Sequence, residues 1–231
     1  MTPKDRLIVA LDVPAPDEAR ALVDSLQDAV GMFKVGSQLF TEAGAPFVRE
    51  LVSRGLKVFL DLKYHDIPNT VANAVARAAE LGVSLLTVHA LGGRAMMEAA
   101  MGALPAMGTR VLAITILTSH DEDSLGELGI RGTLHENVTR LARLAREAEV
   151  DGVVASPHEV GVVRSACGAS FLVVTPGIRP AGAPKGDQAR AATPQAAISA
   201  GADYIVVGRP ILEASDPRAA AEAIVSSLTE A

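Results

Sequence analysis

Short apolar runs rich in Val, Ile and Leu recur along the whole chain and alternate with segments that have helical spacing. Their hydrophobicity is continuous and not alternating, which is typical of strands buried on both faces of a parallel sheet. The eight runs are LIVALD (7–12), MFKVG (32–36), KVFLDLK (57–63), LLTVHA (85–90), VLAITILTS (111–119), GVVAS (152–156), FLVVTPGI (171–178) and YIVVGRP (204–210). The intervening segments, such as APDEARALVDSLQ and LHENVTRLARLAREA, are rich in helix-forming Ala, Leu, Glu and Arg.

This alternation predicts an α/β fold, the TIM (β/α)8 barrel, in which eight parallel strands close on themselves inside a ring of helices. Helix signals agree locally, because Thr193 precedes Pro194 as a predicted cap, and Gly82 and Gly201 follow helical stretches as predicted stops. No linker divides the chain, so we expect residues 1–231 to form a single domain. The alternative is an open doubly wound sheet, but no G-x-G-x-x-G turn follows the first apolar run.

Charge and cysteine content narrow the classes of function. The 27 Asp and Glu residues outnumber the 21 Lys and Arg, which gives a formal charge of -6, and the basic residues form no block. Such a chain lacks general attraction for phosphate backbones, so we expect no nucleic-acid partner. Cys167 is the only cysteine, which excludes an internal disulfide and suits a reducing compartment. The first apolar run is too short for a secretion signal or a membrane span, and we expect a soluble, cytoplasmic protein without a membrane partner.

Polar residues gather where the predicted strands end. In a barrel of this kind the carboxyl ends of the strands carry the chemistry, whereas the strand interiors fill volume. The end positions hold Asp12, Lys34, Asp61 with Lys63, His89, Thr118 with Ser119, Ser156, Arg179, and Gly208 with Arg209. Each one alone is explained as a helix cap or a solvated group, but their convergence on one face predicts an active site there.

The stretch DLKYHD predicts a charged array at the end of the third strand. Asp61 and Lys63 are two residues apart and share a face of a strand, which is the barrel mouth if Leu62 faces the helices. Lys34 lies in the apolar run MFKVG, where an unpaired ammonium is costly to bury, so it requires a carboxylate partner. We expect the two lysines to alternate with Asp61 and Asp66 in one array. A purely structural network of ion pairs is the alternative.

The last third of the chain predicts a phosphate site and a loop that covers it. The run VVGRPI places Gly208, whose backbone lets a ligand approach closely, before Arg209 and the predicted start of a short helix. Many barrels bind phosphate at this corner. The loop 179–192 is rich in Gly, Ala and Pro, so we expect a lid that folds Arg179 and Gln188 onto a phosphate. A simple turn and a loop without function are the alternatives.

These motifs resemble those of the orotidine 5′-phosphate decarboxylase family, bacterial type. The similar segments are DLKYHDIPNT, HALGG, TPGIRP, DQARAATP and GADYIVVGRPI, which occur in the family's order and extend over nearly the whole chain. The D-x-K-x-x-D-I-P-N-T run is highly specific. The resemblance implies decarboxylation of orotidine 5′-monophosphate to uridine 5′-monophosphate and CO₂, the last step of de novo UMP (pyrimidine) biosynthesis, with no metal and no organic cofactor.

The resemblance also implies a role for each site residue. Lys63 is expected to protonate a C6 carbanion, with Asp61 beside it, and Lys34 and Asp66 complete the catalytic set. The expected substrate contacts are Asp12 and Lys34 at the ribose, Thr118, alone or with Ser119, at the pyrimidine, and Arg179, Gln188, Gly208 and Arg209 at the phosphate. Members of the family share their active sites across a homodimer, so Asp66, Ile67 and Thr70 are expected to serve the partner subunit's site. His65 lies at a variable position of the family and receives no role.

Two other functions stay open on the sequence alone. A Mg²⁺-dependent decarboxylase or aldolase of the same suprafamily, acting on a sugar phosphate such as a 3-keto-hexulonate 6-phosphate, also carries Asp and Lys on its third strand. That relative lacks Pro-Asn-Thr after the D-x-K-x-x-D run, and EDTA would abolish its activity. A non-catalytic barrel that binds a phosphorylated metabolite would keep Gly208 and Arg209, but it has no need for the charged array.

Overall fold

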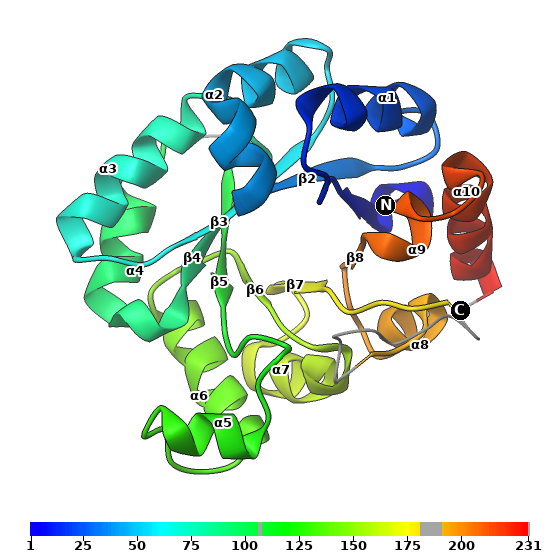
Figure 1. The fold of residues 1–231 in the computed structure, drawn as a ribbon. Helices are drawn as coiled ribbons and strands as arrows, with labels where there is room; N and C mark the ends of the chain where they lie inside the picture. The colour runs from blue at the N-terminus through cyan, green and yellow to red at the C-terminus, as the bar shows by residue number, and fades with distance from the viewer. Residues whose placement is uncertain (106–107, 181–190, 231) are drawn as a thin grey trace.

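Eight parallel strands form a closed barrel, in which each strand pairs with the next along the chain and β8 pairs with β1 (Figure 1). The computed structural model describes residues 1–105, 108–180 and 191–230. The strands are β1 (Leu7–Ala10), β2 (Met32–Gly36), β3 (Val58–Tyr64), β4 (Leu85–His89), β5 (Arg110–Ile114), β6 (Gly152–Val154), β7 (Leu172–Thr175) and β8 (Tyr204–Val207). The predicted (β/α)8 barrel is confirmed.

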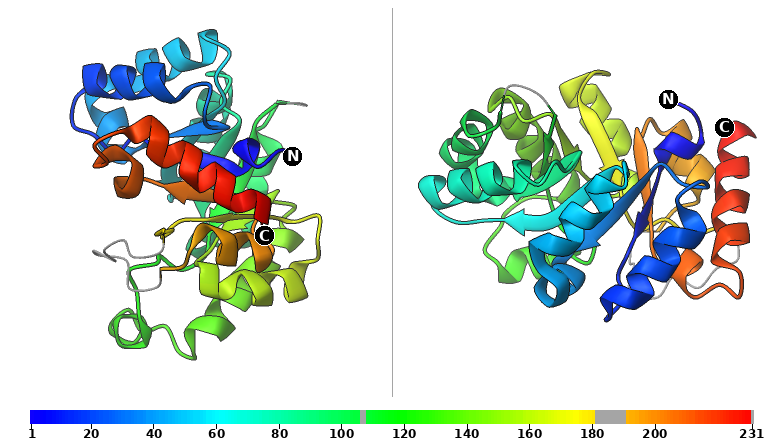
Figure 2. Two further views of the ribbon diagram at one scale, coloured as in Figure 1. Left: turned by 90° about the vertical axis from the view of Figure 1, so that its right-hand side faces the viewer. Right: turned by 90° about the horizontal axis from the view of Figure 1, so that it is seen from above.

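Helices surround the barrel and cover the outer faces of its strands (Figures 1 and 2). They are α1 (Pro16–Leu26), α2 (Ser37–Ser53), α3 (Pro68–Ala79), α4 (Gly93–Gly102), α5 (Glu122–Glu127), α6 (Leu134–Glu147), α7 (Val160–Cys167), α8 (Pro194–Ser199), α9 (Arg209–Leu212) and α10 (Pro217–Ser227). Short 3-10 turns lie at Lys4–Arg6, Ala90–Gly92, Pro157–Glu159 and Leu228–Glu230. The amino terminus and the end of α10 lie on the same side of the barrel (Figure 2). In the part of the chain that the structure describes, none of the helices combines the length and the hydrophobicity of a membrane span.

Local sequence signals account for the ends of several helices. The Thr193 hydroxyl accepts a hydrogen bond from the backbone N–H of Ala196 at 3.2 Å, and Pro194 occupies the first position of α8. Gly82 and Gly201 lie just beyond the ends of α3 and α8. The predicted cap and both predicted stops are therefore confirmed.

The strands are buried on both faces, which gives the protein two apolar cores. Inside the barrel pack Ile8, Ala10, Met32, Phe59, Leu85, Leu112, Val174, Tyr204 and Val206. The larger core lies between the strands and the helices, and it holds residues that alternate with the inner ones, such as Leu7 and Val9 of β1. This double burial is why the strands are continuous apolar runs in the sequence.

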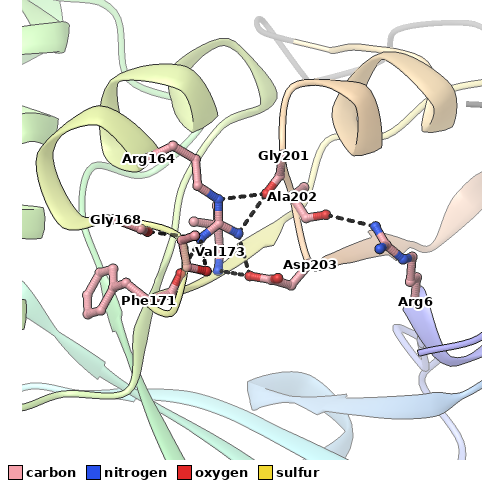
Figure 3. Close-up of polar contacts among 9 residues, drawn as sticks. Arg6, Arg164, Gly168, Phe171, Val173, Gly201, Ala202 and Asp203 are labelled. Carbon is pink, nitrogen blue, oxygen red and sulfur yellow. Dashed lines mark hydrogen bonds and ion pairs between the residues drawn. The ribbon is translucent and has the colours of Figure 1, made fainter.

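A polar cluster centred on Arg164 joins the amino ends of β7 and β8 (Figure 3). The Arg164 guanidinium, from α7, donates to the carbonyl of Gly201 at 2.8 and 2.6 Å and pairs with the Asp203 carboxylate at 2.6 Å. It also donates to the carbonyl of Phe171. Asp203 in turn accepts the N–H of Val173 at 2.7 Å. Because the cluster lies at the end of the barrel away from the predicted site, its role is to fix the loops that precede these strands.

Candidate active site

A cavity of about 440 Å³ opens at the carboxyl ends of the strands. Its polar lining consists of Asp12, Lys34, Asp61, Lys63, Thr118, Arg179, Gly208 and Arg209, and its apolar lining includes Phe59, Ile114, Ile116, Leu117, Val154 and Val206. The charged side chains come from β7, β8, β1, β2 and β3 or from the turns after them, which form a continuous arc of the barrel. A larger hollow of about 670 Å³ follows the outer face of α6 and is lined by residues of that helix. The converging charges favour the barrel mouth as the active site.

Four charged side chains form a chain of contacts in this cavity. Lys34 Nζ lies 2.9 Å from Asp12 Oδ1 and 3.7 Å from Asp61 Oδ2. Lys63 Nζ lies 2.8 Å from the same Asp61 oxygen. The Lys34 and Asp61 side chains are only 10% and 11% exposed, so each charge depends on its neighbours of opposite sign in place of water. The carboxylate partner that the buried Lys34 requires is present, and acids and ammonium groups alternate along the chain of contacts.

Gly36, at the end of β2, leaves the space in which the Lys34 ammonium lies. A Cβ atom at this position would come within 2.9 Å of Lys34 Nζ and 3.2 Å of Asp12 Oδ1. Any larger residue would therefore push the ammonium away from its carboxylate. In the sequence the signal for this contact is faint, because Gly36 merely shares a strand face with Lys34, two residues before it.

The Asp61–Lys63 contact is built on an irregular strand. The pairing of β3 with β4 is regular as far as Leu60 and resumes at Tyr64, with a shift of register between them. Lys63 lies in the left-handed region, with a φ of 52°. Leu62 packs against the core between barrel and helices, and Asp61 and Lys63 line the cavity. They reach the mouth through a bulge, and not through the simple alternation of a regular strand.

Thr87, on the neighbouring β4, contacts both members of this pair. Its hydroxyl donates to Asp61 Oδ1 at 3.0 Å and accepts the backbone N–H of Lys63 at 2.9 Å, and the residue is fully buried. In the sequence Thr87 is one hydroxyl within the apolar run LLTVHA and raised no expectation. The available signal was its place two residues before His89, which puts both on one face of the strand.

Asp66 does not take the place predicted for it in the array. It is exposed and its Oδ1 accepts the N–H of Ile67 at 2.6 Å, whereas Asp12 supplies the second carboxylate beside Lys34. The reason is that β3 ends before Asp66, where the chain turns into α3. Ile67 and Thr70 are exposed on the same turn. The service of these residues to a partner subunit's site stays a prediction.

Two guanidinium groups line the part of the cavity formed by the last strands. Arg179 follows β7, and Arg209 follows β8. Burial, together with the nearby positive charge of Arg209, lowers the pKa of Arg179 below its ordinary value. Two cations that face one pocket fit a phosphate or a carboxylate group. Gln188, predicted to join them, and positions 181–190 of the predicted lid lie outside the described residues.

The run VLAITILTS is a strand only in its first half, because β5 ends at Ile114. Thr118 and Ser119 therefore lie in the loop that follows the strand and not at its end. Thr118 lines the cavity, whereas Ser119 is exposed and lies outside this lining. Of the two residues, Thr118 is the one in position to meet a ligand in the cavity.

His89 and His65 form a stacked pair, with ring centroids 5.3 Å apart. His89 Nδ1 accepts the N–H of Leu91 at 3.3 Å and so caps the short turn after β4. Burial, and then the nearby His65 and Lys63, lower the pKa of His89 to about 4. His89 is therefore neutral at neutral pH, and its contacts are those of a structural cap.

The fold and the cavity define a class of protein, the (β/α)8 barrels whose ligand site lies at the carboxyl ends of the strands and is lined by paired charges. The family model described as orotidine 5′-phosphate decarboxylase / HUMPS family matches residues 5–224. The chain belongs to that family.

The similarity to known proteins extends over nearly the whole chain. An orotidine 5′-phosphate decarboxylase of Halorhodospira halophila is 54% identical over 228 residues, which cover 98% of this chain and 97% of that protein. One of Legionella pneumophila (strain Lens) is 52% identical and covers 99% of this chain and 100% of its own. The crystal structure of orotidine 5′-phosphate decarboxylase from Lactobacillus acidophilus matches with a TM-score of 0.85 at 42% identity, covering 96% of this chain and 98% of the other. The resemblance expected from the motifs is confirmed.

Proposed function

We propose that this protein converts orotidine 5′-monophosphate to uridine 5′-monophosphate and CO₂, the last step of de novo UMP synthesis. Membership of the family supports the reaction. The observation that carries the proposal is the Asp61–Lys63 pair in the cavity, with Lys63 Nζ 2.8 Å from Asp61 Oδ2 and the Lys63 side chain 38% exposed. The amine is thus held by an acid and still accessible to a ligand.

The decarboxylation requires a positive charge beside C6 of the pyrimidine. Loss of CO₂ from C6 of the pyrimidine leaves an electron pair in an orbital in the plane of the ring, where the ring π-system cannot delocalise it. An ammonium about 4 Å away stabilises such a charge by roughly 4 kcal/mol at an effective dielectric constant of about 20. The largest enzymatic accelerations need roughly 20 kcal/mol, so contacts with the distant phosphate must contribute through the orientation and desolvation of the substrate.

Lys63 is the proposed proton donor to C6. Asp61 is proposed to hold the Lys63 ammonium in place through their 2.8 Å contact, with its carboxylate beside the substrate carboxylate that leaves as CO₂. Lys34 contacts both Asp12 and Asp61, and its positive charge is proposed to offset the negative charges of these two carboxylates. Asp12 and Lys34 are also proposed to contact the ribose hydroxyls, because both line the same wall of the cavity.

The pyrimidine and the phosphate of the substrate are proposed to contact different parts of the cavity. Thr118 is proposed to contact the pyrimidine, with apolar neighbours such as Ile116 and Val154 packing on the ring. Arg179, Gly208 and Arg209 are proposed to hold the phosphate, because the two guanidinium groups form the cationic part of the cavity away from β3. Gln188 is proposed at the phosphate from the family motif.

A homodimer with shared active sites is the proposed assembly. Ile67 is 67% exposed, and Asp66 and Thr70 are exposed beside it, so these three are accessible to a second subunit. In that arrangement Asp66 of the partner subunit would add a further carboxylate to the array of Asp12, Lys34, Asp61 and Lys63. As a biosynthetic enzyme with a single, buried cysteine, the protein is proposed to act in the cytoplasm.

The direct test follows the loss of absorbance of orotidine 5′-monophosphate with purified protein, with and without EDTA. Turnover that is insensitive to the chelator is expected. Activity that EDTA abolishes, or binding without product, would favour the sugar-phosphate enzyme or the non-catalytic barrel.

Lys63→Ala tests the role of the amine. We expect turnover to fall by at least about 10⁴-fold, because the proton donor and the local cation are lost together, while uridine 5′-monophosphate still binds through the phosphate contacts. Lys57→Ala is the matched control, since Lys57 is an exposed lysine just before the other end of β3. Near-normal turnover of Lys63→Ala would overturn the assignment.

A further inference from the structure

The backbone that carries Lys63 is held in an unfavourable shape. Between the paired positions Leu60 and Tyr64 of β3, the neighbouring β4 advances past one residue only, Thr87. Three residues of β3 are thus opposite a single residue of β4, which is a larger bulge than the usual one extra residue. Lys63, the last of the three, has a φ of 52°, which residues with a side chain seldom adopt. Such a conformation persists only where its surroundings enforce it.

The Thr87 hydroxyl makes the contacts that hold this bulge. A hydroxyl has one hydrogen to donate and lone pairs to accept, and Thr87 uses both functions. It accepts the Lys63 backbone N–H at 2.9 Å and donates to Asp61 Oδ1 at 3.0 Å. The residue is fully buried, so water does not replace either bond. One side chain therefore ties the backbone of the amine to the side chain of its acid.

The hydrogen bond from the Thr87 hydroxyl to Asp61 also orients the Asp61 carboxylate relative to the two amines. Because Thr87 donates to Oδ1, Oδ2 is left for Lys63 Nζ at 2.8 Å and Lys34 Nζ at 3.7 Å. A β-branched side chain such as threonine has few rotamers, and burial restricts them further. The carboxylate plane, and with it the position of the Lys63 ammonium, is thus set by a residue that does not line the cavity.

We propose that Thr87 is a positioning residue for the reaction, which sets the Lys63 backbone and the Asp61 carboxylate so that the ammonium meets C6 of the substrate. This inference rests on the proposed function and deepens it, because it names a determinant of turnover outside the cavity lining. The arginines proposed to hold the phosphate follow β7 and β8, away from β4, so the effect of Thr87 falls on the chemical step and not on binding.

Three variants separate the hydroxyl from the packing. Thr87→Val keeps the branched shape and loses the hydroxyl, and Thr87→Ser keeps the hydroxyl and loses the methyl group. Thr115→Val is the matched control, because Thr115 is also fully buried, just after β5, and its hydroxyl donates to the carbonyl of Val154 at 3.1 Å, away from the charged array. For each variant we would measure kcat, KM, the Kd of uridine 5′-monophosphate and the melting temperature.

Thr87→Val is expected to lower kcat by about 10- to 100-fold, because a displacement near 1 Å at a reacting group has effects of this order. KM and the Kd of uridine 5′-monophosphate should change by less than about 3-fold, since the phosphate contacts remain. Thr87→Ser should restore most of kcat, and Thr115→Val should keep the wild-type value. The proposal is overturned if Thr87→Val retains kcat, or if Thr87→Ser loses as much as Thr87→Val.

The two proposals fail in different ways. If the wild-type protein does not turn over orotidine 5′-monophosphate, the proposed function fails. A crystal structure of Thr87→Val then judges the positioning role without activity. A changed Lys63 φ or a turned Asp61 carboxylate supports that role, whereas an unchanged bulge overturns it.

Discussion

Asp61 is shared by two ammonium groups, and this sharing explains how one barrel mouth holds two lysines so close together. Its Oδ2 lies 2.8 Å from Lys63 Nζ and 3.7 Å from Lys34 Nζ, while Asp12 supports Lys34 from the other side. Removing one member of a buried pair leaves the other charge without compensation. At the scale of residues, a substitution of Asp61 therefore disturbs both amines, and its effect on activity does not isolate Lys63.

His89 makes stability depend on pH. Its pKa of about 4 in the folded chain lies below the ordinary value of 6.5, so the unfolded chain takes up the proton first as the pH falls. The free energy of unfolding should therefore decrease as the pH is lowered from about 6.5 toward 4. His89→Asn keeps an acceptor for the Leu91 N–H and removes the titration, so its melting temperature should fall less over this range than that of the wild type.

The control for this measurement is His135→Asn, at an exposed histidine on α6. Comparing each variant with the wild type at every pH removes the contribution that carboxylates make to acid unfolding. An identical pH dependence of the melting temperature in wild type and His89→Asn would contradict the prediction.

At the scale of elements, the closeness of β6 and β7 depends on Gly152. A Cβ atom at this position would lie 2.3 Å from the backbone oxygen of Leu172, with which Gly152 pairs. Because the obstacle is backbone, it has no rotamer change to relieve the clash. Gly152→Ala is expected to lower the free energy of unfolding by at least about 1–3 kcal/mol, measured by urea denaturation followed by circular dichroism.

Gly161→Ala is the matched control, since a Cβ there meets nothing within 4 Å. Gly161 lies in α7, where alanine favours the helix by up to about 1 kcal/mol over glycine, so this variant should be as stable as the wild type or more stable. Equal stability of the two alanine variants would show that β6 and β7 tolerate a wider separation.

The strand positions could be predicted from the sequence because each strand is buried on both faces. The ends were less certain. The run VLAITILTS continues past β5 because the following loop is itself apolar, with Ile116 packed in the outer core. Polarity alone does not distinguish such a loop from a strand. The sequence pattern therefore predicted that the strand extends to Thr118, whereas β5 ends at Ile114.

The part of the candidate site around Lys34 could be predicted, because a lysine in an apolar strand requires a carboxylate partner. Lys34 in an apolar strand required an acid, and two acids are present. Asp66 lies outside the array within one chain, because β3 ends before it and the chain turns there into α3, and its place in a partner subunit's site stays a prediction. Thr87 was missed because its importance arises from contacts with the neighbouring strand β3, and Gly36 because it leaves space for the Lys34 ammonium beside Asp12; both depend on side-chain positions that the sequence pattern does not give.

At the scale of the whole molecule, the proposed shared sites can be tested by mixing two inactive subunits. Lys63→Ala and Asp66→Asn each remove one component of every site in a homodimer. In a mixed dimer, one site combines an intact Lys63 with an intact Asp66 of the partner subunit, so co-expressed chains should regain about a quarter of the wild-type activity.

The control mixes Lys63→Ala with Asp61→Asn. Both residues belong to the same chain's part of a site, so every site in the mixed dimer lacks one of them and no activity should return. Size-exclusion chromatography with light scattering gives the assembly of each mixture. A dimeric mixture of Lys63→Ala and Asp66→Asn that stays inactive would contradict sharing of the sites.

The arrangement of charges around the mouth also sets the length of a ligand that can reach all of them. In a closed ring of eight strands, β3 and β7 stand diametrically opposite, so Lys63 and Arg179 belong to facing walls. A molecule must extend from one wall to the other to engage both. If the arginines hold the phosphate as proposed, we expect inorganic phosphate, or a phosphorylated sugar too short to reach β3, to bind there without contacting Lys63. Only a ligand long enough to reach both walls would then bring a reacting carbon to the amine.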